Sequence, residues 1–151
     1  MLTDDDRRIL RRLQDMPSLS MPDLGAALGL STQKVARRVE KLKEQGVIRA
    51  TRAVIDWRAL GYEVEVSLRF SLDKTQRTAF DEFIAAARAV PEVIEIQTFL
   101  GKVDVRLNVI ARDMAHYQSL YRDAILPLPH IADIEALMHV ATVKAQDRLP
   151  L

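Results

Sequence analysis

A stretch beginning at Ser31 combines short polar side chains with regularly spaced cations. From Ser31 to Gln45 the chain holds five basic and two acidic residues, a net charge of +3. In a helix, short polar side chains in the first turn can reach base edges in the DNA major groove, and Arg or Lys further along can neutralise phosphates. We therefore predict contacts with double-stranded DNA from a set of polar and basic residues: Ser31, Thr32, Gln33, Lys34, Arg37, Arg38, Lys41 and, beyond this stretch, Arg52.

Three short helices are predicted to position these side chains. Each begins at a hydroxyl residue that can cap free backbone amides: Thr3, Ser20 and Ser31. They are expected to end near Asp15, at Gly29 and near Gly46. On the third helix an apolar stripe repeats at i, i+4 and i+7, formed by Val35, Val39 and Leu42. Helix, Gly-containing turn, helix is the helix-turn-helix arrangement. The alternative is that the charged face of the third helix is only solvated.

The rest of the chain predicts a second, mixed domain. A β-branched stretch at residues 49–55 predicts a strand leaving the helices, and residues 62–72 alternate apolar and polar side chains as a half-buried strand does. Helical periodicity follows at 80–87 and after Asp113, with further strands at 93–100, 103–109 and 131–143. The order β-α-β-β-α-β is ferredoxin-like. The expected fold class is α+β: a winged-helix-like helix-turn-helix domain at 1–48, a strand and hinge linker at 49–61, and a ferredoxin-like domain at 62–151.

Charge divides along the same boundary. The 151-residue chain has a net charge of +1, but residues 1–58 carry 12 basic and 8 acidic side chains, and residues 59–151 carry 10 and 13. A net +4 segment followed by a net −3 segment indicates a nucleic-acid-facing part joined to something else. The chain has no Cys, no apolar run long enough for a membrane span and an acidic start. We expect it in the cytoplasm, associated with the nucleoid, with no membrane partner.

Several separate stretches match one family in order and spacing. They are Asp6, Ile9, Leu10 and Leu13 in the first helix; Leu30-Ser31, Val35, Arg38-Val39, Leu42 and Gly46-Val47-Ile48 in the DNA-binding part; Leu60-Gly61 at the hinge; and Gly101, Asp104, Leu128-Pro129 and Ile131 in the second domain. On these residues the chain resembles the Lrp/AsnC (leucine-responsive regulator/asparagine regulator, "feast/famine") family along nearly its full length.

The resemblance implies a transcription regulator that forms a dimer or an assembly of dimers and binds an amino acid or related small molecule between C-terminal domains. The Asp104 carboxylate could hold an α-ammonium group, and backbone amides around the Gly101 turn could receive a carboxylate. Carried over by position, the effector-binding residues are Thr98, Gly101, Lys102, Asp104, Leu128 and His130. The chain departs from the family pattern at Lys102, Val103 and His130, where an acidic residue, an aromatic and Gly are frequent. If the Gly and Asp are instead ordinary turn residues, this site is absent.

Two other functions compete with regulation. Sirohaem decarboxylases resemble this family in architecture and suggest a His-Asn-Tyr type segment where this chain has Thr98-Phe99-Leu100-Gly101. The three His residues have no metal-ligand spacing, and there is no phosphate loop or nucleophile motif, so we expect no catalytic residue, no metal and no cofactor. The second alternative is a metabolite-sensing interaction protein that does not bind an operator.

Overall fold

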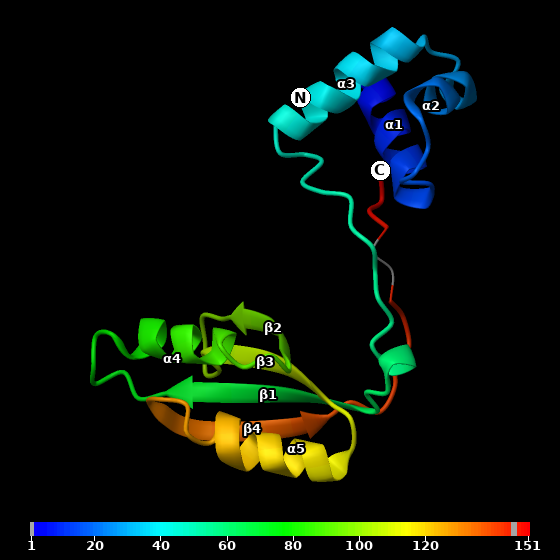
Figure 1. Ribbon diagram of the computed structural model, residues 1–151. Coiled ribbons are helices and arrows are strands. Elements are labelled where there is room, and N and C mark those ends of the chain that lie inside the picture. Colours follow the sequence, from blue (N-terminus) through cyan, green and yellow to red (C-terminus); the bar gives the residue numbers. More distant parts are fainter. Residues whose placement is uncertain (1, 146–147) are drawn as a thin grey trace. The chain divides into compact units, whose positions relative to one another are not determined.

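The computed structural model describes residues 2–145 and 148–151, which fall into two compact units (Figure 1). The N-terminal unit comprises the described residues up to Val54 together with those of Lys144–Leu151, and the second unit is Ile55–Val143. The second unit is therefore inserted, along the chain, between two parts of the first.

The N-terminal unit is a three-helix domain whose predicted caps are confirmed. It contains α1 (Asp4–Asp15), α2 (Met21–Leu28) and α3 (Thr32–Glu44). The hydroxyls of Thr3, Ser20 and Ser31 each accept a hydrogen bond from the backbone amide three residues on, at 3.2–3.3 Å. Gly29, between α2 and α3, has a φ of 67°, the left-handed conformation that ends a helix at low cost for glycine. One apolar cluster fills the space between the helices, formed by Ile9, Leu10, Leu24, Val35, Val39 and Leu42.

The strand predicted at 49–55 is wrong. In the described part of the chain, residues 49–56 are exposed and belong to no strand. β-branched residues favour a strand where neighbouring side chains and a partner backbone are present, and no described residue pairs with this segment. It leads into a short 3-10 turn, η1 (Arg58–Leu60), which ends at Gly61.

The last described residues pack against α1. Gln14 contacts the backbone of Leu149 twice: its Oε1 accepts from the Leu149 amide at 2.6 Å and its Nε2 donates to the Leu149 carbonyl at 3.4 Å. Arg148 Nη2 lies 3.3 Å from Asp15 Oδ2, and Leu151 packs against the apolar cluster of the three helices. These residues therefore belong structurally to the N-terminal unit.

The second unit confirms the predicted β-α-β-β-α-β order. Its elements are β1 (Val64–Leu72), α4 (Ala79–Arg88), β2 (Val93–Thr98), β3 (Val105–Ala111), α5 (Met114–Leu120), the π-helical turn η2 (Tyr121–Ile125) and β4 (Ile131–Met138). The sheet is antiparallel with strand order β2-β3-β1-β4. Relative to expectation, β1 begins two residues later and β4 ends at Met138, five residues earlier.

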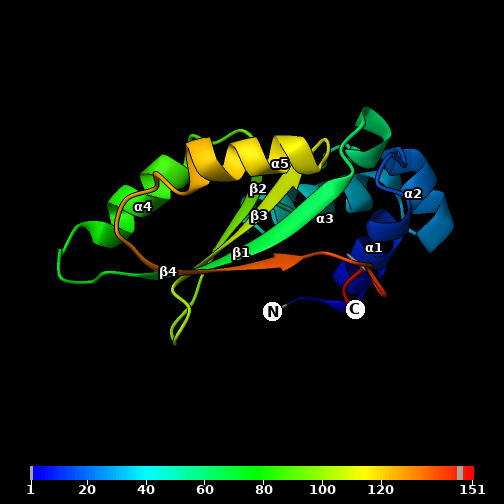
Figure 2. The ribbon, with the colours of Figure 1, turned by 90° about the horizontal axis from the view of Figure 1, so that it is seen from below.

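Both long helices of this unit cover the same face of the sheet (Figure 2). Alternate β1 residues, Val66, Leu68 and Phe70, are buried under them. The Phe70 and Phe83 rings pack at a centroid distance of 4.9 Å, which ties β1 to α4. The opposite face carries the alternating polar residues of β1, and no helix of the described residues covers it. The core therefore fixes the position of β1, and three of the candidate effector residues lie near its C-terminal end.

Candidate functional site

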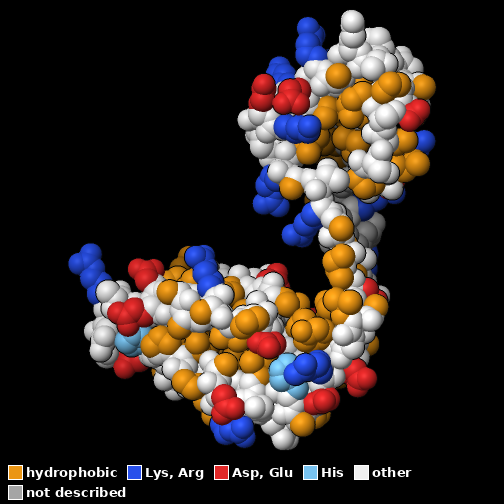
Figure 3. All heavy atoms as spheres, in the orientation of Figure 1, with side chains coloured by type: hydrophobic (Ala, Val, Ile, Leu, Met, Phe, Trp, Pro, Cys, Tyr) orange, Lys and Arg blue, Asp and Glu red, His pale blue; other side chains and the backbone are white. Residues whose placement is uncertain are grey.

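The exposed face of α3 carries the residues predicted to contact DNA. Thr32, Gln33, Arg37 and Lys41 are exposed, while the apolar stripe of the helix is buried. Arg37 and Lys41 are four residues apart and so lie on one side of the helix. Within the described residues neither of them forms an ion pair inside the protein. Figure 3 shows Lys and Arg side chains projecting from this unit at α3. The arrangement leaves two cations available to an external polyanion.

Two other residues that were predicted to contact DNA form ion pairs with acidic residues of α1. Lys34 Nζ lies 2.8 Å from Asp5 Oδ2, and Arg38 Nη1 lies 2.9 Å from Asp6 Oδ1. Arg38 also donates to the Thr3 hydroxyl at 2.7 Å. The hydrogen bond from Lys34 is the main cause that holds the pKa of the Asp5 carboxyl below its ordinary value. Lys34 and Arg38 therefore link α3 to α1, and they also lie beside the exposed face of α3.

The remaining predicted DNA contacts differ in setting. The Ser31 hydroxyl caps α3 by accepting from the Lys34 amide at 3.3 Å. Arg52 is exposed in the segment that follows α3, outside the helix.

One residue that positions α3 was not predicted from the sequence. Gly25 is buried in α2, where that helix meets the turn into α3. Its only signal in the sequence is a glycine inside a predicted helix.

Asp104 is the most buried of the polar effector candidates. Its residue is only 7% exposed. One carboxylate oxygen, Oδ2, accepts from the Leu72 amide at 2.9 Å, and the other, Oδ1, lies 2.6 Å from Lys74 Nζ. Burial raises the pKa of this carboxyl, but the Leu72 amide and Lys74 together outweigh it, so the pKa lies below its ordinary value. The sequence did not identify Lys74 as a partner.

The end of β1 also meets the segments that carry Lys102 and His130. The Ser71 hydroxyl donates to the Lys102 carbonyl at 2.8 Å, and the Asp73 amide donates to the His130 carbonyl at 2.8 Å. His130 has a φ of 63°, uncommon for a residue with a side chain, and its Nε2 lies 2.6 Å from Glu82 Oε2. Lys102, Asp104 and His130 are thereby brought together around residues 71–74.

The other effector candidates lie elsewhere in the second unit. Thr98 lines an open groove of about 450 Å³ between α4 and β2, together with Phe80, Ile84 and Ile96. Leu128 is buried in the apolar core of the second unit. Gly101 is exposed in the hairpin between β2 and β3.

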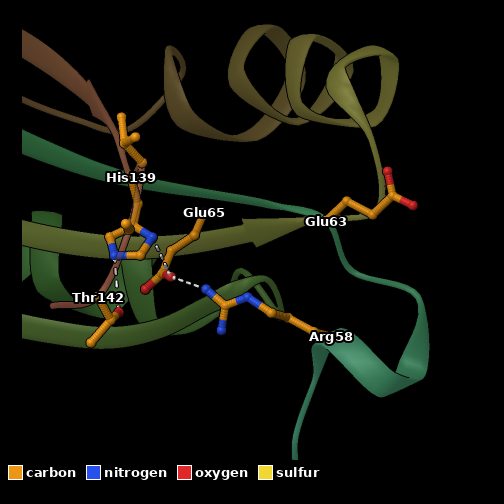
Figure 4. Close-up of a pocket in the computed structure, with 7 residues that line it drawn as sticks. Arg58, Glu63, Glu65, His139 and Thr142 are labelled. Atoms are coloured by element: carbon orange, nitrogen blue, oxygen red, sulfur yellow. Dashed lines mark hydrogen bonds and ion pairs between the residues drawn. The ribbon is translucent and has the colours of Figure 1, made fainter. Parts of the chain in front are cut away.

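A separate cleft of about 300 Å³ lies at the start of β1 (Figure 4). Glu65 accepts from Asn108 Nδ2 at 2.8 Å and from Arg58 Nη2 at 3.0 Å, and its Oε2 lies 3.3 Å from His139 Nδ1. His139 Nε2 lies 3.1 Å from the Thr142 hydroxyl. These side chains form hydrogen bonds and ion pairs with one another. The cluster therefore links η1, β1, β3 and the segment after β4, and its polar atoms are already paired rather than available to a ligand.

Comparison with known proteins decides the family. A family model described as the Lrp/AsnC ligand binding domain matches residues 65–149, and one described as a winged helix-turn-helix DNA-binding domain matches residues 3–49. The chain belongs to the Lrp/AsnC family. It is a DNA-binding transcription regulator of that family, as its resemblance predicted.

Individual Lrp/AsnC relatives match along nearly their whole length. The leucine-responsive regulatory protein of Haemophilus influenzae is 32% identical, covering 97% of this chain and 88% of the relative. The proline dehydrogenase transcriptional activator of Rhodobacter capsulatus is 31% identical, covering 94% and 92%. A transcriptional regulator of Neisseria meningitidis solved as a complex with L-Met superposes with a TM-score of 0.90 at 24% identity, over 99% of this chain and 97% of that one, and shows the shared fold.

The described residues contain neither a metal-binding cluster nor a helix that could span a membrane. Over residues 2–145 and 148–151, no group of three or more His, Asp or Glu side chains is arranged to hold a metal ion. No helix in that part of the chain has the length and apolar character needed to cross a bilayer.

Proposed function

We propose that this Lrp/AsnC regulator binds operator DNA through the exposed face of α3, and that it acts by binding rather than by catalysis. The observation that carries the proposal is the contrast among the cations of one helix. Lys34 and Arg38 are paired with acids of α1, whereas Arg37 and Lys41 point outward without such partners among the described residues. Helix cations left available in this way can neutralise phosphates, and Thr32 and Gln33 at the start of α3 are placed to reach base edges.

A gel-shift titration tests operator binding. The full chain is titrated against a duplex from upstream of its own gene and against a shuffled duplex of equal length and composition. Specific binding typically exceeds non-specific binding by about 10³-fold or more. Equal affinity for the two duplexes would contradict operator recognition and favour the interaction-protein alternative.

We also propose that the second unit binds an amino acid or related small molecule near the end of β1. Support comes from the buried Asp104 carboxylate, whose chemistry suits an ammonium group, and from the L-Met complex of a protein with the same fold. Thermal-shift screening of the full chain against the twenty amino acids tests this, because a ligand that binds only the folded protein raises its stability. A flat screen would contradict amino-acid sensing.

Self-association is proposed for the face of the sheet opposite α4 and α5. On that face the Ser67 hydroxyl and Arg106 Nε are buried without a hydrogen-bond partner among the described residues, which is unusual for polar atoms. Leu137 of β4 is 36% exposed there. A second copy covering this face would bury Leu137 and supply polar partners. Sedimentation should give at least a dimer, and a monomer at micromolar concentration would contradict the proposal.

The proposed place of action is the cytoplasm, at the nucleoid, because operator binding requires access to DNA. A fluorescent fusion should follow the DNA stain in intact cells, and uniform exclusion from it would argue against this location.

A further inference from the structure

The Asp104 carboxylate is oriented by the backbone. Its Oδ2 accepts from the Leu72 amide at the end of β1, and its own amide donates to the Phe70 carbonyl at 2.8 Å. The paired register of β1 and β3, with Phe70 opposite Val105, holds both ends of this contact. The second oxygen, Oδ1, therefore has a fixed position and accepts a cation there.

The cation at Oδ1 is the ammonium group of Lys74, whose side chain is much more exposed than that of Asp104. The side chain of Lys74 is 70% exposed, whereas that of Asp104 is 9% exposed. Water screens the exposed ammonium group of Lys74, and this weakens its ion pair with Asp104. The carboxylate is therefore held in place by the backbone, whereas its cation reaches it from solvent, where another ammonium group can compete for the same oxygen.

We propose that Lys74 is a tethered competitor for the ammonium group of the effector. Before the effector binds, the ε-ammonium group of Lys74 is paired with the Asp104 carboxylate. An amino acid whose ammonium group binds this carboxylate displaces Lys74 and releases the turn at residues 73–78 that precedes α4. Lys74 then sets effector affinity, while the Asp104 carboxylate restricts the site to ligands that carry an ammonium group. This inference rests on the proposed effector function of the second unit.

The test measures binding of each of the twenty L-amino acids to the full chain by calorimetry, for the wild type and four variants, one of which, Asp104→Asn, removes the charge of the carboxylate. Lys74→Met keeps the length of the side chain without its charge, and Lys74→Arg keeps a cation. Arg77→Met is the matched control, because it removes an exposed cation from the same turn, three residues further on. Lys74→Met should bind the preferred amino acid about two- to fivefold more tightly than wild type, as loss of an exposed ion pair allows. Lys74→Arg and Arg77→Met should stay within error of wild type.

The 2-oxo acid analogue of the preferred amino acid separates competition from a general change of the site. It lacks the ammonium group, so Lys74→Met should bring it no gain in affinity. Equal affinity of wild type and Lys74→Met for the amino acid, with binding lost in Asp104→Asn, would contradict competition by Lys74 and would still support the effector function. No binding of any amino acid to wild type or either Lys74 variant would overturn the effector function and this inference with it.

Discussion

Gly25 of α2 lies directly against the carbonyl oxygen of Leu30, in the turn between α2 and α3. A Cβ atom added to Gly25 would stand 2.7 Å from that oxygen and 3.4 Å from the Thr32 amide nitrogen. The Leu30 amide in turn donates to the Gly25 carbonyl at 2.9 Å. This backbone contact sets how closely α2 approaches the start of α3, and hence how α3 is presented.

Enlarging Gly25 should therefore destabilise the N-terminal unit in proportion to side-chain size. Gly25→Val should lower the free energy of unfolding by about 1–3 kcal/mol, because the neighbour is backbone and cannot rotate away. Gly25→Ala should cost less, since alanine regains about 0.5–1 kcal/mol of helix propensity. Ala26→Val, at an exposed position of the same helix, is the control and should cost less than about 0.7 kcal/mol. Thermal unfolding measures all three, and equal effects at positions 25 and 26 would refute the contact.

Removing the carboxylate of Asp5 should strengthen DNA binding. Asp5→Asn frees Lys34 from its 2.8 Å ion pair, so affinity should rise and the slope of log K against log[salt] should steepen by about one unit, for one more phosphate neutralised. Asp4→Asn removes the same charge from the neighbouring position and should leave the slope unchanged. An unaltered slope in Asp5→Asn would mean that Lys34 does not reach phosphate.

Glu65 and Glu63 offer a matched pair at the start of β1. Glu65→Ala would leave Arg58, Asn108 and His139 without their shared acceptor, and we expect a loss of about 1–3 kcal/mol in the free energy of unfolding. Glu63 points away from this cluster in Figure 4, so Glu63→Ala should change stability by less than about 0.5 kcal/mol. Chemical denaturation of the two variants provides the comparison, and a similar loss in both would show that the cluster contributes nothing.

Acid should weaken the second unit through Asp104. The pKa of this carboxyl is lowered from its ordinary 3.8 in the folded protein, so its contribution to stability is fully present above the unfolded-state value and is lost as pH falls through the folded one. Asp104→Asn should flatten the part of the stability profile below about pH 4. Asp133→Asn, exposed on β4, should not. Thermal melts from pH 3 to 7 test this, and parallel profiles for wild type and Asp104→Asn would argue against an ionised Asp104.

The elements that sequence predicted correctly depend on local chemistry. Hydroxyl caps at Thr3, Ser20 and Ser31 and the glycine after α2 act within a few residues, so they can be recognised without knowing the tertiary structure. The strand expected at 49–55 failed because strand formation also requires a partner, and no described residue supplies one.

Contacts between residues far apart in the sequence could not be predicted from local patterns. The pairing of Asp104 with Lys74 depends on the β1–β3 register, which brings together residues 30 positions apart. Likewise, no local pattern near Leu149 indicates that it packs on Gln14 of α1. The sequence could therefore name Asp104 as a candidate but not the cation that occupies it.

Binding of Arg37→Ala to the operator tests the central claim most directly. Fluorescence anisotropy at several salt concentrations should be measured for wild type, for Arg37→Ala and for Arg88→Ala, an exposed arginine of α4 in the other unit. We predict that Arg37→Ala weakens operator binding, either with a salt slope shallower by about one unit or with about 1–3 kcal/mol less discrimination against a shuffled duplex, while Arg88→Ala matches wild type. Wild-type affinity, salt slope and discrimination in Arg37→Ala would contradict recognition of DNA through this face of α3.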